Sequence, residues 1–163
     1  MPLLLRKIRK NRWYKDLAWL PGGNLQADSL VDLTTKDNKL SVWFIKDDMS
    51  NLERVIAALA ANRDFIANFD YALFSEEILE KKDIKTEKSK GDSKDYEAND
   101  QWHRDLYELS ATKLLDIAEH IFNEGTIKRI QEKQVEKHIN EAVQTGKIKF
   151  ETLEEEVKSK INN

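Results

Sequence analysis

The chain of 163 residues contains no cysteine. This absence excludes disulfide scaffolds, thiolate metal sites, iron–sulfur centres and cysteine nucleophiles. It also fits the reducing environment of the cytoplasm, where we expect the protein to reside.

Long hydrophobic runs are missing as well. No stretch approaches the roughly 20 apolar residues of a membrane span. The N-terminal sequence MPLLLRKIRKNRWYK has three leucines before the basic residues begin, whereas a secretory signal has charge first and then about 7–15 apolar residues. We therefore expect a soluble protein without a secretory signal and without a membrane partner.

A strong excess of one charge is also absent. The chain has 27 basic and 30 acidic residues and a net charge of −3, which argues against a protein-wide electrostatic surface for nucleic acid or acidic membranes. Core-forming residues, by contrast, are plentiful: 40% of residues are hydrophobic, including four Trp, four Tyr and six Phe. This length and composition predict a globule with its own core.

The first half of the chain carries β-type patterns. Residues 3–8 (LLLRKI) predict a short strand, and PGGN at 21–24 predicts a turn. The segments SLVDLT and LSVWFIK, joined by TKDNK, predict a β-hairpin over residues 29–46 with its tight turn at Asp37-Asn38. Because both faces of the second hairpin strand are apolar, we expect more strands and a helix layer to cover it.

A helix is predicted directly after the hairpin. Ser50 followed by Glu53 is typical of a capping box, and apolar residues at helical spacing follow. We expect this helix to break near Asn62, and a short helix to run from a cap at Ser75 through Lys81.

Residues 81–100 look like a linker. Twelve of these twenty residues are charged, so the segment cannot bury enough surface to offset its ordering entropy. We predict a flexible, charged, solvated loop, with ordering on a partner as the alternative. The chain is then a single domain over residues 1–163, or two docked subdomains (1–80, α+β; 101–163, helical) joined by this loop.

Beyond the loop the chain predicts helices only. The first is capped by Asn99 or Asp100 and ends at Gly125, the second covers residues 126–145, and a last short helix ends at Ile161. The predicted fold class is therefore α+β: a small N-terminal β-hairpin or sheet packed by helices, followed by a mainly helical C-terminal half.

The sequence WHRD at 102–105 raises the question of a catalytic histidine. On the predicted helix, adjacent side chains diverge, and His103 falls in an apolar arc with Ile117 and Ile121. We therefore interpret His103 as a buried histidine with one hydrogen-bonded ring nitrogen. For His138, the sequence pattern identifies no particular carboxylate as a partner. We find no pattern for a catalytic residue, a metal site or a cofactor.

One basic cluster stands near the N-terminus, interleaved with aromatic residues. Such a segment could grip a nucleic-acid strand by charge and by stacking. The alternative is a solvated edge segment whose charges prevent unwanted strand pairing. The basic residues are Arg6, Lys7, Arg9, Lys10, Arg12 and Lys15.

The leading functional hypothesis is a non-enzymatic cytoplasmic protein-interaction module or accessory subunit. Its partner is another protein or a second copy of the chain, and its candidate contact surface is formed by Trp13, Tyr14 and Trp19. Two alternatives stay open. The first is a nucleic-acid-binding protein that uses the basic segment, and the second is a hydrolase or nuclease whose residues come together only in the fold.

Overall fold

The computed structural model describes residues 1–161. Within that range, six strands form one antiparallel sheet in the order β4-β5-β2-β1-β3-β6. The α+β class is therefore confirmed. The strands are β1 (Leu3–Lys7), β2 (Leu40–Ile45), β3 (Phe69–Ser75), β4 (Lys85–Lys88), β5 (His103–Tyr107) and β6 (Thr126–Ile130).

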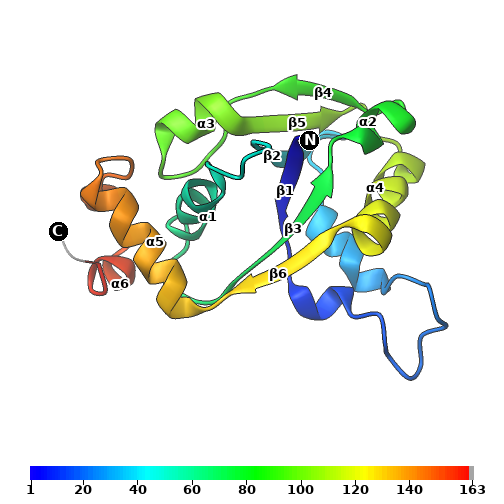
Figure 1. The fold of residues 1–163 in the computed structure, drawn as a ribbon, viewed down its shortest axis with the longest axis horizontal. Coiled ribbons are helices and arrows are strands. Elements are labelled where there is room, and N and C mark those ends of the chain that lie inside the picture. The colour runs from blue at the N-terminus through cyan, green and yellow to red at the C-terminus, as the bar shows by residue number, and fades with distance from the viewer. Residues whose placement is uncertain (162–163) are drawn as a thin grey trace.

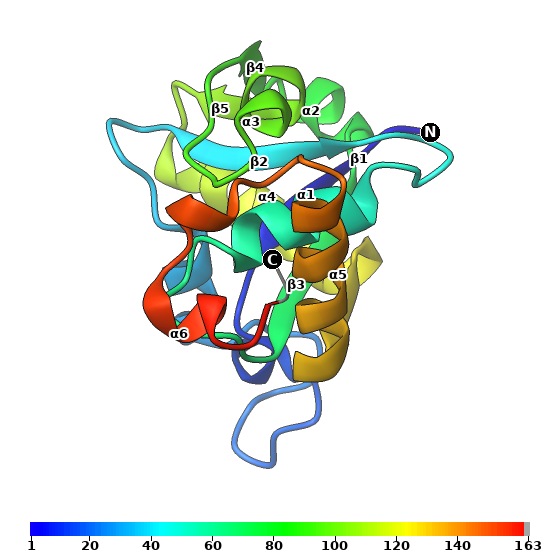
Figure 2. The same ribbon diagram turned by 90° about the vertical axis from the view of Figure 1, so that its left-hand side faces the viewer.

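Helices cover both faces of the sheet, and each face has its own apolar core (Figures 1 and 2). The helices on one face are α1 (Leu52–Ala60), α3 (Tyr96–Trp102), α5 (Glu132–Gln144) and α6 (Glu155–Lys158), with the short η3 (Phe150–Thr152) before α6. Those on the other face are η1 (Lys10–Trp13), η2 (Ala27–Leu33), α2 (Glu77–Lys81) and α4 (Ala111–Glu124). Because β3 lies between two covered faces, its residues 69–74 are all buried.

Several local predictions are confirmed. A strand occupies residues 3–7, and the amide of Asn24 donates to the carbonyl of Pro21 in the predicted turn. Helix α1 ends at Ala60, close to the expected break, and α2 ends at Lys81. None of the helices in residues 1–161 is both long enough and apolar enough to cross a membrane.

The hairpin over residues 29–46 is wrong in its first strand. Residues 27–33 form the 3-10 helix η2, and β2 pairs with β1 and β5 instead. The tight turn does form, with positive φ angles of 53° at Asp37 and 57° at Asn38. The side chain of Asp32 accounts for the difference, because it accepts hydrogen bonds from the amide of Arg9 and the indole of Trp13. These contacts anchor η2 on η1.

The predicted capping box is also wrong. Helix α1 begins after Asn51, without a side-chain cap. The Asn51 side chain instead joins β2 to the helix: its amide donates to the carbonyl of Phe44 at 2.9 Å, and its oxygen accepts from the amide of Lys46 at 2.9 Å.

The C-terminal half is mainly helical, as expected, but it is not purely helical, and this is the largest correction. Residues 99–125 do not form one helix, because α3 ends at Trp102 and β5 separates it from α4, which Ser110 caps. Residues 126–130 form β6 rather than the start of a helix. Pairing of β5 with β2 and of β6 with β3 satisfies backbone groups that a helix would otherwise satisfy locally.

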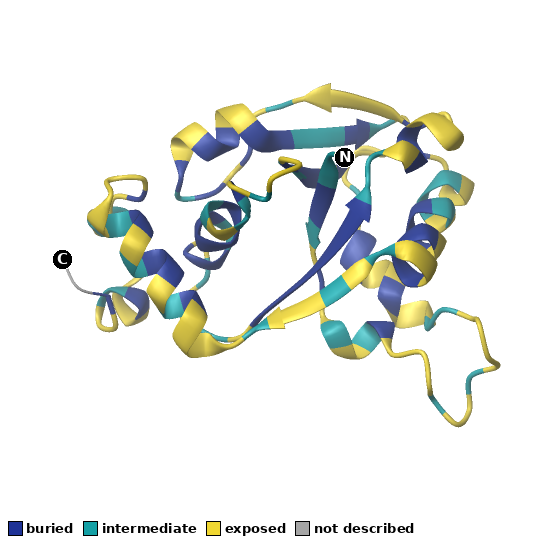
Figure 3. Ribbon diagram, viewed as in Figure 1, coloured by how far each residue is buried: buried dark blue, intermediate teal, exposed yellow. Residues whose placement is uncertain are grey.

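The segment 81–100 is not a loop throughout. Residues 85–88 form β4, an exposed edge strand paired with β5 (Figure 3), and α3 begins at Tyr96. Strands from both halves of the chain share one sheet, yet the division into one domain or two docked subdomains stays a prediction.

Candidate functional site

The two central strands, β1 and β2, stop pairing before either strand ends. The register between β1 and β2 stops at the pair Leu5–Trp43, although both strands extend past it. Arg6 lies at this gap. Its Nη1 donates to the carbonyl of Ser41 at 2.7 Å, and its Nε donates to the carbonyl of Asp32 at 2.9 Å. In the middle of the sheet, the Arg6 side chain thus donates to a strand carbonyl that normally accepts from a backbone amide.

A cavity of about 380 Å³ opens at the gap, and we call it the β1–β2 notch. Its walls come from β1, β2, β5, the end of α1 and the segment before α3. Small-molecule sites typically begin at about 300 Å³, so the notch is large enough for one. Its lining residues are Arg6, Lys7, Ser41, Trp43, Leu59, Lys90, Asp92, His103 and Asp105.

His103 lies in this notch on β5, not on a helix. It is 6% exposed, and the hydroxyl of Ser89 lies 2.8 Å from its Nδ1. The ring of Trp43 packs edge-on at 5.3 Å between centroids. Burial lowers the pKa of His103, and the negative charge of Asp105 opposes that shift. The expected burial and hydrogen bond are therefore confirmed, while the helix from which they were inferred is wrong.

Positive charge gathers around Lys7. Lys7 is an exposed residue at the end of β1, but partial desolvation of its ammonium lowers its pKa, and the charges of Arg63, Arg6 and Arg9 lower it further. Within residues 1–161, Lys7 forms no ion pair. The notch therefore holds a cation that forms no ion pair with a carboxylate of residues 1–161.

The carboxylates of Asp92 and Asp105 also line the notch, and neither forms an ion pair within residues 1–161. The hydroxyl of Ser41 donates to Asp105 at 3.3 Å, and these two residues are direct cross-strand neighbours. Asp92 belongs to the segment before α3. Both carboxylates can accept hydrogen bonds from a ligand that carries hydroxyl groups.

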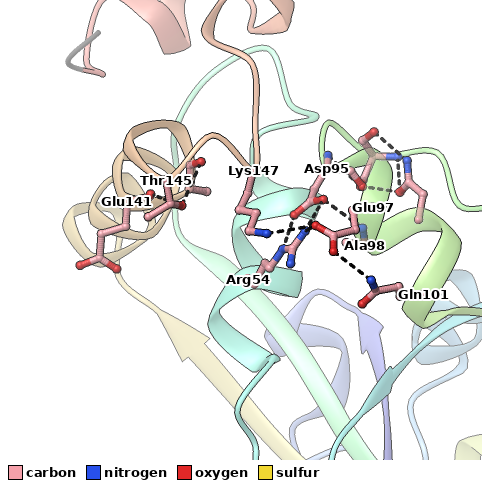
Figure 4. Close-up of polar contacts among 11 residues, drawn as sticks. Arg54, Asp95, Glu97, Ala98, Gln101, Glu141, Thr145 and Lys147 are labelled. Carbon is pink, nitrogen blue, oxygen red and sulfur yellow. Dashed lines mark hydrogen bonds and ion pairs between the residues drawn. The ribbon is translucent and has the colours of Figure 1, made fainter.

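The segment before α3 is held in place by a partly buried ion pair (Figure 4). Asp95 is 1% exposed and accepts hydrogen bonds from Nε and Nη2 of Arg54, at 2.5 and 2.9 Å. Arg54 Nη2 also donates to Glu97 at 2.7 Å. Asn99 adds a second anchor, because its side chain makes hydrogen bonds with both the amide and the carbonyl of Ser93.

Gly91 permits the close packing of this segment against the notch. A Cβ at this position would lie 3.0 Å from Oδ1 of Asn99, 3.0 Å from Cη2 of Trp43 and 3.1 Å from Cβ of His103. A larger residue would therefore displace the notch wall. Gly91 therefore allows the segment to pass close to Trp43 and His103, and it does not mark a flexible loop.

The predicted basic cluster does not form one continuous surface. Arg12 forms an ion pair with Asp32 at 2.7 Å, and Arg6 is bound to backbone carbonyls as described above. The ammonium of Lys15 lies 4.8 Å from the ring centre of Phe122. Nucleic-acid binding through this segment stays a prediction. The members whose side chains form no ion pair within residues 1–161 are Arg6, Lys7, Arg9, Lys10 and Lys15.

The three aromatic residues of the predicted contact surface differ in exposure. Trp13 is buried, and its indole donates to Asp32 at 2.9 Å. Tyr14 is 47% exposed and Trp19 is 70% exposed. Trp19 belongs to the loop that projects from the body of the molecule between η1 and η2 (Figure 1). Of these three residues, Tyr14 and Trp19 are therefore the ones available to a partner.

Sequence reasoning missed most of the notch. Ser41, Lys90 and Asp105 come from three separate segments, and only the folded chain brings them together. The one usable signal was the alternation in HRDLY, which puts His103 and Asp105 on the same side of a strand. No protein-family model, curated protein or solved structure matches the chain.

Proposed function

We propose that this protein is a non-enzymatic cytoplasmic binding module that takes a phosphorylated small molecule in the β1–β2 notch. The observation that carries the proposal is the unpaired charge of Lys7, which lies close to the charges of Arg6, Arg9 and Arg63. Charges of one sign held together destabilise the fold, and a dianionic phosphate would reverse that effect.

The other lining residues support an organic phosphate over the inorganic ion. Trp43 and Leu59 offer an apolar wall for a ring or a carbon chain, while Asp92 and Asp105 offer acceptors for hydroxyl groups. A mononucleotide or a sugar phosphate has all of these parts.

Calorimetric titration of the full chain with inorganic phosphate, a mononucleotide and a sugar phosphate tests the proposal. We expect Lys7→Gln to weaken binding of the organic phosphates at least tenfold. We also expect the free variant to be slightly more stable than the parent, because the substitution removes like-charge repulsion. Lys133→Gln removes the same charge from an exposed position on α5 and should change neither property.

Three results would contradict the proposal. The first is no heat of binding with any of the three ligands at millimolar concentration, and the second is an equal loss of affinity in both variants. The third is much tighter, steeply salt-dependent binding of a single-stranded oligonucleotide, which would favour the nucleic-acid alternative.

The exposure of Trp19 favours a second function, that of a protein-interaction module. Large aromatic residues that project into solvent are common binding hot spots. A photo-reactive amino acid at position 19 should form an adduct with a partner in native lysate, and a matched probe at the exposed Phe65 should not. Adducts with a second copy would indicate self-association, and the absence of adducts at position 19 would contradict this function.

A further inference from the structure

A second cavity lies between two packed helices, α1 and α5. Its volume is about 320 Å³, and we call it the α1–α5 groove. Glu53 lies in the first turn of α1, and His138 and Glu141 lie one turn apart on α5. One ligand atom from each of these three side chains lies within 4.8 Å of the other two.

His138 is the unusual member of this group. Its side chain is 5% exposed, and its Nδ1 is buried without a hydrogen-bond partner among residues 1–161. The nearest carboxylate oxygen, Oε2 of Glu53, is 3.8 Å away, which is too far for a hydrogen bond. A buried polar nitrogen without a partner destabilises a fold. A ligand between His138 and Glu53 would satisfy it.

Two basic side chains also line the groove, but other residues already neutralise them. Arg54 and Lys147 both bind the carboxylate of Glu97, at 2.7 and 3.1 Å (Figure 4). Their positive charge is therefore directed to the α3 side of the groove.

The two carboxylates of the group have no strong basic partner among residues 1–161. Among residues 1–161, Glu53 has no basic partner other than His138. Glu141 faces an exposed lysine, Lys137, at 3.8 Å on the same helix, and exposed pairs of this kind contribute little. Two carboxylates and an imidazole nitrogen thus lie within 4.8 Å of one another, while the two cations that line the groove bind Glu97.

We propose that Glu53, His138 and Glu141 bind a Zn²⁺ ion. Imidazole and carboxylate are typical zinc ligands, and three protein ligands leave a fourth position for water. Ligand atoms in a tetrahedral zinc site lie about 3.3 Å apart, given bond lengths of about 2.0–2.1 Å. Both glutamates are exposed and free to rotate inward. The inference does not depend on the phosphate ligand proposed for the notch.

Calorimetric titration of the metal-free full chain with Zn²⁺ tests this site. We expect one ion per chain and a higher thermal midpoint of unfolding in its presence. Glu53→Gln should weaken binding at least tenfold, and His138→Gln at least a hundredfold. His120→Gln is the matched control, because it removes another buried histidine with an unpaired ring nitrogen and should leave binding unchanged.

Two results would overturn the proposal. If Zn²⁺ binds both variants as tightly as the parent, the ion lies elsewhere. If the parent binds none at millimolar concentration, His138 and Glu53 form at most an ion pair. Should His138→Gln fail to fold, Glu53→Gln decides the matter alone, because the Glu53 side chain is exposed.

Discussion

His103 and His138 are equally buried, yet the fold treats their Nδ1 atoms differently. In the β1–β2 notch, the hydroxyl of Ser89 lies 2.8 Å from Nδ1 of His103. In the α1–α5 groove, Nδ1 of His138 has no hydrogen-bond partner in the described part of the chain. The first ring is part of a satisfied polar network, and the second needs an added ligand. Burial alone therefore does not identify a functional histidine, whereas an account of its hydrogen bonds does.

The largest effect is expected at Arg54, which connects the two regions. It lines the groove and also holds Asp95, next to the notch. Arg54→Ala leaves the buried Asp95 carboxylate unpaired, and we expect urea-induced unfolding to show a loss of about 3–5 kcal/mol. Lys39→Ala is the control, since its ion pair with Glu87 is exposed and should contribute less than about 1 kcal/mol. Equal losses in the two variants would show that the Arg54 contacts do not join the regions.

Removal of the hydrogen-bonded imidazole of His103 should have the next largest effect on stability. His103→Ala creates a cavity beside Trp43 and deprives Ser89 of its partner. We expect the free energy of unfolding to fall by about 1–3 kcal/mol, measured in urea and by thermal melting. If His103→Ala is as stable as the parent but binds no phosphate ligand, our interpretation of His103 as a packing residue is wrong. His103 would then act mainly in ligand binding.

Removal of the His138 imidazole, whose Nδ1 lacks a hydrogen bond within residues 1–161, should have almost no effect on stability. His138→Met keeps the volume of the side chain and eliminates a buried nitrogen without a partner. In metal-free buffer we expect a change below about 1 kcal/mol, in the stabilising direction. A loss as large as that of His103→Ala would contradict the difference between the two histidines.

The smallest effect concerns the pH dependence of stability. Hydrogen bonds from Arg54 and then Lys147 lower the pKa of Glu97 from 4.5 to about 2. The folded chain thus binds this proton more weakly than the unfolded chain. The stabilisation is complete above pH 4.5 and is lost as the pH falls toward 2.

Glu97→Gln should flatten the fall in unfolding free energy across that acid range. Solvent screens the exposed Glu97, so the difference from the parent will be modest. Glu151→Gln, which removes an exposed carboxylate that forms no ion pair within residues 1–161, is the control. Parallel pH profiles for the parent and Glu97→Gln would show that the Glu97 contacts do not shift its pKa.

Prediction from the sequence succeeded where neighbouring residues carry the signal. The strand at 3–7 follows from an apolar run, and the turn at Asp37-Asn38 follows from two residues that tolerate positive φ. It failed for HRDLY and TIKRI, which became β5 and β6. Their hydrogen-bond partners are on β2 and β3, about 60 positions away, and such pairing overrides local helix preference.

The sequence by itself determined the α+β class, the supply of apolar residues for a core and the exclusion of thiol chemistry. These properties depend on composition and on patterns within a few residues. Only the tertiary structure decided that Lys7 shares a cavity with Asp105, and that Glu53 meets His138. The physical reason is that strand pairing and helix packing join segments far apart in the chain, and no local pattern records which polar side chains will face each other across those contacts.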